Sequence, residues 1–477
     1  MPTYPSQKTI QAPWLLFIGV LALACAAWFA QPEFFLAPAL LVAGVCVPTV
    51  WRRPELTLAV VLLMVPFETL QQLSFSKFLT LSKLAGAAGI VLVGYRLLTG
   101  RADCRRLRTR MWWLIALLLG VHLVGSVGSI APEMSIEHTR KLFIAVAVFG
   151  LGLVLIPRLP ARRWVEMAFF SVAATAALSL AGPGEADVQS RNLGFLTDAN
   201  YFAMLLVSSV PLGLYLLRTA PRPLYGAVVA VSLVFLLIAT VQSFSRSAFV
   251  VFMLLVAFWL WGERHRVRRM PASSIGLAGA FGLVVMLGAV AVAPTEYVQR
   301  VTSLAQLVEG TQGLEDRSLG RRSSYLVVGL EATANRPVFG SGPGTYPVLY
   351  SRSPFAVGFS LSDGPDSLFR RAHNTYLELM VEVGLPGAFA FVALVVYGTV
   401  NFRRARAIWL HLGQWELAEL ARHCGLAFMS IALFLFLLSA PNLKWFWFFL
   451  AFSHVMLAAA ERYGAPIAPY CDGAPRN

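Results

Sequence analysis

The chain has 477 residues, of which 57% are hydrophobic and 13% are charged, and its mean hydropathy is +0.68. Because soluble domains carry about 25% charged residues, this composition excludes an ordinary soluble protein and indicates a polytopic membrane protein. The net charge of +15 is spread over short loops between apolar runs, which argues against nucleic acid as a partner.

Up to fourteen apolar runs are long enough, or nearly so, to cross the roughly 30 Å hydrocarbon core of a bilayer. Those before Pro157 are Trp14–Ala30, Phe35–Val50, Leu56–Leu70, Leu84–Leu98, Met111–Ile130 and Leu142–Ile156. Those after it are Trp164–Leu180, Tyr201–Leu217, Leu224–Thr240, Ala248–Trp261, Ser274–Val292, Tyr376–Val400, Leu417–Ala440 and Trp445–Ala460. Leu56–Leu70 and Ala248–Trp261 are short for a span, so we expect about 12–14 transmembrane helices.

Arginine marks every second loop. The arginine-bearing loops are Arg52–Arg53, Arg101–Arg110, Arg158–Arg163, Arg218–Arg222, Arg264–Arg269 and Arg403–Arg406. The positive-inside rule assigns them, and with them both termini, to the cytoplasm. The opposite side then receives Gly182–Asn200, Gln242–Ser247, Pro294–Ala372 and Pro441–Lys444. The first apolar run has a weak signal-peptide character, but the alternation works with this run retained as a helix.

The predicted domain organisation is simple. Residues 1–293 hold the N-terminal transmembrane helices, 294–375 form an extracytoplasmic cap loop with short helices, and 376–477 hold the last transmembrane helices and a cytoplasmic tail. Within the cap, Glu296–Glu309 and Arg321–Asn335 have helical spacing, and Tyr325, Leu326, Val328, Leu330 and Ala332 could form an apolar face. The glycine-rich stretch Gly340–Gly344 is interpreted as a turn.

Arginines recur on the external side, next to membrane-facing runs. Arg191 precedes a glycine turn, and Arg246 lies in the tight turn Ser243–Ser247. Arg321 opens the second predicted cap helix. A guanidinium carries a planar fork of donors suited to phosphate, although an arginine at a helix end can also simply reach the interface. In the same region Asp198 and Asn200 begin a helix, and Asp198 is suited to cap it.

His373 is distinct among the seven histidines, because it alone lies beside the cap at the start of a helix. His138 is expected in a short external loop. Asn374 follows His373, and Thr375 and Glu378 have the spacing of a capping box, so a structural role for the whole stretch is an open alternative. No Cys or His spacing resembles a zinc site, and we expect neither a metal nor a cofactor.

Three motifs together resemble the O-antigen ligase and O-antigen polymerase family of bacterial inner membranes. They are Arg191-x-x-Gly194-x-x-x-Asp198-x-Asn200-x-x-Ala203, Ser245-Arg246-Ser-Ala248, and Gly320-Arg321-x-x-x-Tyr325 continuing through Arg336-Pro337-x-x-Gly340-x-Gly342-x-Gly344 to His373-Asn374-x-x-Leu377-Glu378. The resemblance covers about Arg191 to Gly387. It implies a GT-C-like bundle of about twelve transmembrane helices with an extracytoplasmic helical cap.

The same resemblance implies transfer of a glycan from undecaprenyl diphosphate to a sugar hydroxyl at the periplasmic face of the inner membrane. His373 would be the catalytic base of a metal-independent displacement, and Arg191, Arg246 and Arg321 would bind the donor diphosphate. Asn374, Asn200 and Asp198 are candidate orienting residues.

The acceptor is left open by these motifs. A ligase would use lipid A-core, whereas an O-antigen or exopolysaccharide polymerase would extend a growing glycan from the same donor site. A lipid-linked glycan flippase is the alternative of another class, but the apolar runs hold few central ionisable residues, which favours a one-sided enzyme.

Overall fold

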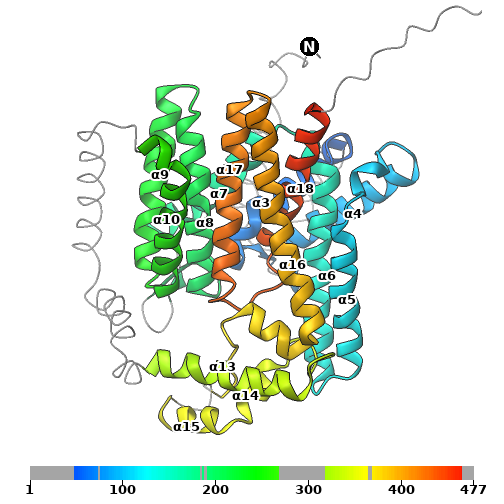
Figure 1. The fold of residues 1–477 in the computed structure, drawn as a ribbon, viewed down its shortest axis with the longest axis vertical. Helices are drawn as coiled ribbons and strands as arrows, with labels where there is room; N and C mark the ends of the chain where they lie inside the picture. Colours follow the sequence, from blue (N-terminus) through cyan, green and yellow to red (C-terminus); the bar gives the residue numbers. More distant parts are fainter. Residues whose placement is uncertain are drawn as a thin grey trace, which may run out of the picture.

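The computed structural model describes residues 48–73, 76–182, 185–186, 191–267, 317–363 and 368–464. Over these residues the protein is almost entirely helical, which confirms the expected all-α class (Figure 1). Long helices run side by side in a bundle, and short helices lie across one of its ends. The predicted runs Trp14–Ala30 and Ser274–Val292, most of Phe35–Val50 and the predicted cap helix Glu296–Glu309 lie outside the described residues.

The bundle contains eleven of the described helices: α3 (Glu55–Met64), α4 (Leu81–Leu98), α5 (Met111–Val127), α6 (Pro132–Leu155), α7 (Ala161–Leu180), α8 (Ala199–Arg218), α9 (Pro223–Gln242), α10 (Arg246–Val267), α16 (Thr375–His411), α17 (Trp415–Phe434) and α18 (Lys444–Gly464). Six of them, α4, α6, α8, α9, α16 and α17, are long and apolar enough to cross a membrane. The protein is therefore a polytopic membrane protein.

Two short antiparallel hairpins connect bundle helices. One pairs β1 (Gln72–Leu73) with β2 (Ser76–Thr80), and the other pairs β3 (Glu185–Ala186) with β4 (Asn192–Gly194). Both lie in loops, so they leave the helical class unchanged.

Several helices extend past the apolar runs that predicted them. Helix α6 begins at Pro132, where proline suits the first turn, and not at Leu142. His138 therefore lies on this helix, and its predicted place in a loop was wrong. Helix α16 likewise continues to His411 instead of ending at Val400. Hydropathy marks the part of a helix that matches hydrocarbon, whereas backbone hydrogen bonds continue it into polar surroundings.

Helix α18 forms the centre of the bundle. Trp445 and Trp447 are fully buried, as are the phenylalanines near them, so the first half of this helix is covered on every side. It packs on α6 and α16. Helix α9, in contrast, exposes Leu224, Val228 and Val231, as expected of a helix whose outer face meets lipid.

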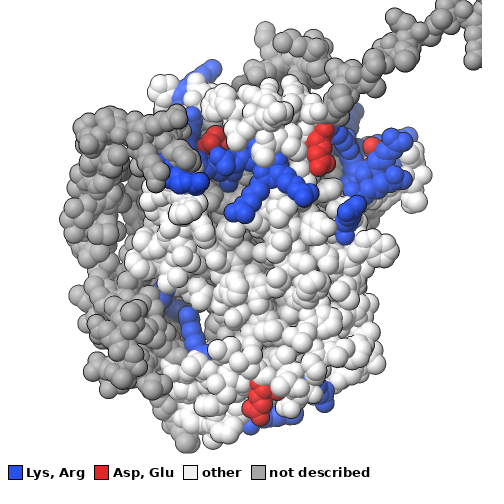
Figure 2. All heavy atoms as spheres, in the orientation of Figure 1, with Lys and Arg blue, Asp and Glu red and all other residues white. Residues whose placement is uncertain are grey.

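The arginine-bearing loops meet at one end of the bundle. Arg158 Nε lies 2.9 Å from Glu55 Oε2, and Arg218 Nη1 lies 3.0 Å from Glu419 Oε2. Arg162 joins them by donating to the Thr219 carbonyl at 3.0 Å. Figure 2 shows the resulting band of basic side chains, which lies away from the end that carries the short helices.

The loops predicted to be external meet at the opposite end. Asn192 Nδ2 donates to Gln242 Oε1 at 3.2 Å, and the Ile130 amide donates to the Ser341 carbonyl at 3.1 Å. The Asn374 amide donates to Ser439 Oγ at 3.2 Å. The alternation of loops read from charge is therefore reproduced by the fold.

A cap of three described helices covers this end: α13 (Arg317–Asn335), α14 (Tyr346–Ser351) and α15 (Pro354–Asp363). Its small core contains Tyr325, Val328, Tyr346 and Tyr350 together with Leu377 of α16. The apolar face predicted for α13 was only partly right.

Two of its five predicted members, Leu326 and Leu330, are about half exposed. Tyr325 and Val328 are buried in the cap core, and Ala332 packs against it.

The cap joins the bundle at a break in α16. Gly384 has a φ of +73°, and a side chain there would collide with the Val338 carbonyl. The next amide, that of Leu385, donates to the Pro337 carbonyl at 2.8 Å. On the other side of the break, the Gly342 amide donates to the Glu382 carbonyl at 2.9 Å. The glycine-rich stretch is thus a turn, as predicted, and it docks directly on α16.

Candidate functional site

His373 lies immediately before α16, at the end of the bundle that carries the cap. Its φ is +49°, a left-handed conformation that costs a non-glycine residue about 1–2 kcal/mol. Its ring lies 6.1 Å from the ring of Tyr325 on α13, measured between centroids. The imidazole is half-buried between cap and bundle. Strained backbone conformations cluster at functional sites, so this conformation makes His373 a candidate functional residue.

The residue that caps α16 is Asn374. Its side-chain oxygen accepts hydrogen bonds from the Tyr376 and Leu377 amides at 3.0 and 3.1 Å. The predicted Thr375–Glu378 capping box was therefore wrong. Thr375 Oγ1 instead donates to the Leu438 carbonyl at 2.6 Å and accepts from the Ala440 amide at 2.9 Å. Asn374 thus caps α16, and Thr375 holds the start of α16 against the loop between α17 and α18.

The Glu378 carboxylate is 1% exposed and turns back toward the residues before His373. Oε1 accepts from the Ala372 amide at 2.9 Å, and Oε2 accepts from Arg371 Nη2 at 3.0 Å. Although burial alone lowers the pKa of Arg371, the carboxylates of Glu378 and Glu382 raise it overall. Arg371 is therefore a permanent positive charge beside His373.

Burial lowers the pKa of His373 below its ordinary value. Four charged groups modulate this effect. Asp198 and Glu378 raise the pKa, whereas Arg322 and Arg371 lower it. Since burial and the two arginines prevail, the imidazole is neutral at neutral pH and has a nitrogen able to accept a proton.

Asp198 and Asn200 connect this region to the second arginine loop. Asp198 caps α8, as predicted, by accepting from the Asn200 and Tyr201 amides at 2.7 and 3.0 Å. Asn200 Oδ1 accepts from Ser245 Oγ at 2.8 Å. Because Ser245 directly precedes Arg246, this bond places the first residue of α10 beside the start of α8.

Arg191 lies half-buried just before β4. The neighbouring Asn192 donates to Gln242 at the end of α9, so the Arg191 and Arg246 loops touch. Arg321 lies one turn before Tyr325 on α13, and its guanidinium lies 5.0 Å from the centre of the Phe359 ring in α15. Arg321 is therefore held within the cap, on the helix that contacts His373.

The predicted site residues form two groups. Arg191, Arg246, Asp198 and Asn200 lie around the starts of α8 and α10, whereas His373 lies against Tyr325 of α13, the helix that also carries Arg321. The charge of Asp198 acts on His373 and thereby links the groups. Asn374 is the N-cap of α16, and its side-chain oxygen accepts from backbone amides of that helix.

Sequence reasoning missed Arg322 and Arg371 as neighbours of His373. Arg322 is three residues before Tyr325 on the same helix, and Arg371 is two residues before His373. Helical spacing from Tyr325 could have identified Arg322. The role of Arg371 depends on the backward turn of Glu378, which no local pattern indicates.

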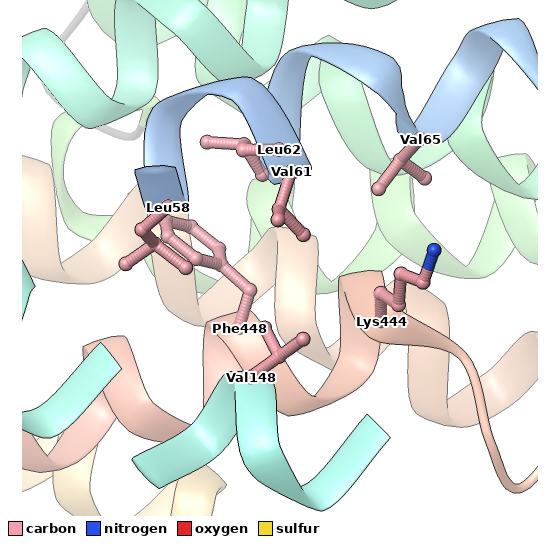
Figure 3. Close-up of a pocket in the computed structure, with 7 residues that line it drawn as sticks. All are labelled: Leu58, Val61, Leu62, Val65, Val148, Lys444 and Phe448. Carbon is pink, nitrogen blue, oxygen red and sulfur yellow. The ribbon is translucent and has the colours of Figure 1, made fainter. Parts of the chain in front are cut away.

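A small pocket lies elsewhere, between α3, α6 and α18 (Figure 3). Its walls are apolar, with Leu58, Val61, Leu62, Val65, Val148 and Phe448, and Lys444 lies at one side. The Lys444 ammonium donates to Ser82 Oγ at 3.0 Å. The space inside it that could hold the centre of a water-sized sphere is about 0 Å³, whereas ligand sites typically have roughly 300–1,000 Å³.

Within the part of the chain that the structure describes, no three His, Cys, Asp or Glu side chains gather as metal ligands would. The charged groups around His373 are instead two carboxylates and two guanidinium groups. Such a set can hold a proton acceptor and an anion side by side.

Residues 231–392 match a family model described as O-Antigen ligase. The matched segment begins in α9, includes Arg246, Arg321 and His373, and ends beyond the break in α16. No curated protein matches the chain. This match and the motifs at the cap end of a polytopic helical bundle together support the resemblance of this chain to the O-antigen ligase and O-antigen polymerase family.

Proposed function

We propose that the protein is an O-antigen ligase that transfers a glycan from undecaprenyl diphosphate to a sugar hydroxyl of lipid A-core. The observation that carries this proposal is the placement of His373. A histidine with a strained backbone and a lowered pKa lies between cap and bundle, at the end of the bundle that also carries Arg191, Arg246 and Arg321.

His373 is the proposed general base. The acceptor oxygen attacks the anomeric carbon of the donor glycan while His373 takes the hydroxyl proton. The bond from that carbon to the diphosphate oxygen breaks, and undecaprenyl diphosphate leaves with the electron pair. A neutral imidazole suits the first role because it can accept a proton near neutral pH.

Arg191, Arg246 and Arg321 are the proposed diphosphate ligands. Negative charge grows on the leaving group as its bond to the sugar breaks, and guanidinium groups stabilise such charge by charge-assisted hydrogen bonds. We infer that these arginines make a metal ion unnecessary. Asp198, Asn200 and Asn374 act as positioning residues for the loops that hold these side chains.

The cap end is the proposed periplasmic face. The basic loops at the other end agree with a cytoplasmic location under the positive-inside rule (Figure 2), and the alternation of charge along the sequence predicts both termini on the same side. Residues 294–375 would then form a periplasmic cap, with 1–293 and 376–477 supplying the membrane helices. The donor's polyprenyl chain would lie among the helices and its diphosphate at the periplasmic surface.

The test is glycan transfer by the purified protein in liposomes that contain undecaprenyl-diphosphate-linked glycan and lipid A-core. His373→Ala should lower the rate about 10²–10⁴-fold, the usual contribution of a general base. His411→Ala is the matched control, because His411 is an exposed histidine at the far end of the same helix. A His373→Ala protein that is folded and fully active would refute the proposed base.

The products of the same reaction distinguish the alternatives. Labelled lipid A-core identifies a ligase, whereas a ladder of longer glycans on the polyprenyl carrier identifies a polymerase using the same donor site. Movement of the donor between leaflets with neither product would indicate a flippase. Addition of EDTA should leave the transfer rate unchanged, and a loss of activity restored by a divalent cation would contradict metal independence.

A further inference from the structure

We propose that Glu378 is a positioning residue that holds His373 for proton transfer, acting through Arg371 and the Ala372 peptide. This inference rests on the proposed role of His373 as the base. Under this inference Glu378 and Arg371 hold the catalytic histidine in position, a role that differs from helix capping and from donor binding.

The first step is the backbone of His373. A φ of +49° is unfavourable for a histidine, so neighbouring contacts must hold it. Without them the segment would relax toward negative φ, and the imidazole would turn away from Tyr325. The contacts on each side of His373 therefore determine where its ring points.

After His373 the chain is fixed by the bundle. The Asn374 amide donates to Ser439 Oγ, and the Thr375 amide donates to the Leu435 and Leu438 carbonyls at 2.8 and 3.1 Å. These bonds involve the loop after α17. They hold the start of α16 but do not determine the path of the chain before His373.

Before His373 the chain is fixed by Glu378. One carboxylate oxygen accepts from the Ala372 amide at 2.9 Å and the other from the Arg371 guanidinium at 3.0 Å. The two residues directly before His373 are thus bound to a single buried carboxylate. Charge-assisted bonds of this kind are about twice as strong as neutral ones.

The same pair also sets the charge around the imidazole. Glu378 and Arg371 act on His373 with opposite signs, as do Asp198 of the α8 cap and Arg322 of α13. Removing only the Glu378 charge leaves Arg371 uncompensated and disfavours imidazolium. Removing only Arg371 leaves Glu378 uncompensated and favours it.

The experiment measures kcat, donor KM and the pH dependence of transfer for Glu378→Gln and Arg371→Met. Glu378→Gln should lower kcat about 100-fold, the effect of a displacement of about 1 Å at a reacting group, with little change in donor KM. The acidic limb of its pH profile should move to lower pH. Arg371→Met should move that limb to higher pH, with a smaller loss of kcat.

Glu382→Gln is the matched control. Glu382 is another buried glutamate of α16, but its carboxylate accepts from the Tyr346 amide of the cap at 3.3 Å. Its substitution should leave the acidic limb of the profile in place. A residue that merely supported the fold would lower the yield of active protein without moving this limb.

The Arg371→Met variant gives a second test if Glu378→Gln fails to fold, because the Arg371 side chain is 39% exposed and the Glu378 carboxylate keeps its hydrogen bond from the Ala372 amide. Folded variants with the wild-type kcat and pH profile would overturn the inference. If those variants behave as wild type while His373→Ala is inactive, only the positioning role fails. If His373→Ala is fully active, the proposed base fails first.

Discussion

Ser245 donates its hydroxyl hydrogen to the side-chain oxygen of Asn200 across 2.8 Å, and this bond joins the turn before Arg246 to the first turn of α8. Both side chains are buried, at 1% and 9% exposure. Two of the three sequence motifs therefore meet in one hydrogen bond, at the end of the bundle that carries the cap.

Replacement of Ser245 by Ala should weaken donor binding. The change leaves the Asn200 oxygen without its donor, which costs about 1–3 kcal/mol for a buried polar group, and it frees the turn that positions Arg246. The expected result is a lower melting temperature and a higher donor KM, with kcat changed less. Thermal unfolding in detergent and donor titrations measure these quantities.

Ser360→Ala is the control for this substitution, because the Ser360 hydroxyl donates only to the Val357 carbonyl of its own helix. It should alter neither quantity appreciably. An unchanged donor KM in a folded Ser245→Ala protein would argue that Arg246 does not depend on this bond.

Gly384→Ala should detach the cap from the bundle. A Cβ at this position meets the Val338 carbonyl, and the φ of +73° adds about 1–3 kcal/mol of backbone strain for alanine. The hydrogen bond from Leu385 to Pro337 would be strained at the same time. We expect faster proteolysis within the cap helices and a loss of transfer activity, measured by limited digestion and the liposome assay.

Gly120→Ala is the comparison for Gly384. Gly120 lies within α5, and a Cβ there meets no atom within 4 Å. Alanine should be neutral, or stabilising by about 0.5–1 kcal/mol, because it favours helix more than glycine does. If both substitutions leave proteolysis unchanged, the break at Gly384 does not hold the cap.

Acid should inactivate the enzyme only below the ordinary histidine pKa. Burial lowers the pKa of His373 in the folded protein, so the base stays neutral until the pH falls through that lowered value. In the window between the folded and unfolded pKa values the unfolded chain binds more protons, so stability also falls as the pH falls. The pH profile of kcat and the melting temperature over the same range test both statements.

Two variants should move this acidic limb in opposite directions. Asp198→Asn removes a charge that raises the pKa of His373, and asparagine still caps a helix, so the limb should move to lower pH without loss of the fold. Arg322→Gln removes a charge that lowers the pKa, so the limb should move to higher pH. A limb that stays fixed in both variants belongs to a group other than His373.

Much of the bundle could be predicted from hydropathy, because hydrocarbon requires continuous apolar helices. The grouping of loops at two ends followed equally well from charge. The capping residue of α16, in contrast, could not be predicted from the sequence. Asn374 and Thr375 are both good capping residues, and the choice between them depends on Thr375 bonding to Leu438 and Ala440, which are more than 60 residues away.

The surroundings of His373 show the same limit. Motif spacing selected His373, Arg321 and Asp198 as candidates, but it did not indicate that Asp198, Arg322 and Arg371 act on the imidazole from three separate elements. Their convergence depends on how α13 lies across the bundle. A single sequence contains no signal for that packing angle, so the electrostatics of the site could be established only from the fold.

Glu166→Gln should destabilise the protein while leaving the activity of each folded molecule unchanged. The Glu166 carboxylate accepts from Arg162 Nε at 3.0 Å, Arg163 Nη1 at 3.1 Å and the Tyr225 hydroxyl at 3.1 Å. Because its side chain is 15% exposed, we expect a loss of about 1–2 kcal/mol, less than for a fully buried pair. Helix α7 has 20 residues and so spans about 30 Å, which separates this cluster from the cap end.

Glu137→Gln is the control, because Glu137 pairs with Arg140 where both side chains are about half exposed and such pairs contribute less than about 1 kcal/mol. Thermal unfolding of both variants should separate the two ion pairs, and transfer rates normalised to folded protein should match the wild type in each. A reduced normalised rate in Glu166→Gln would mean that the arginine-rich end influences transfer at the cap end, through helices that the two ends share.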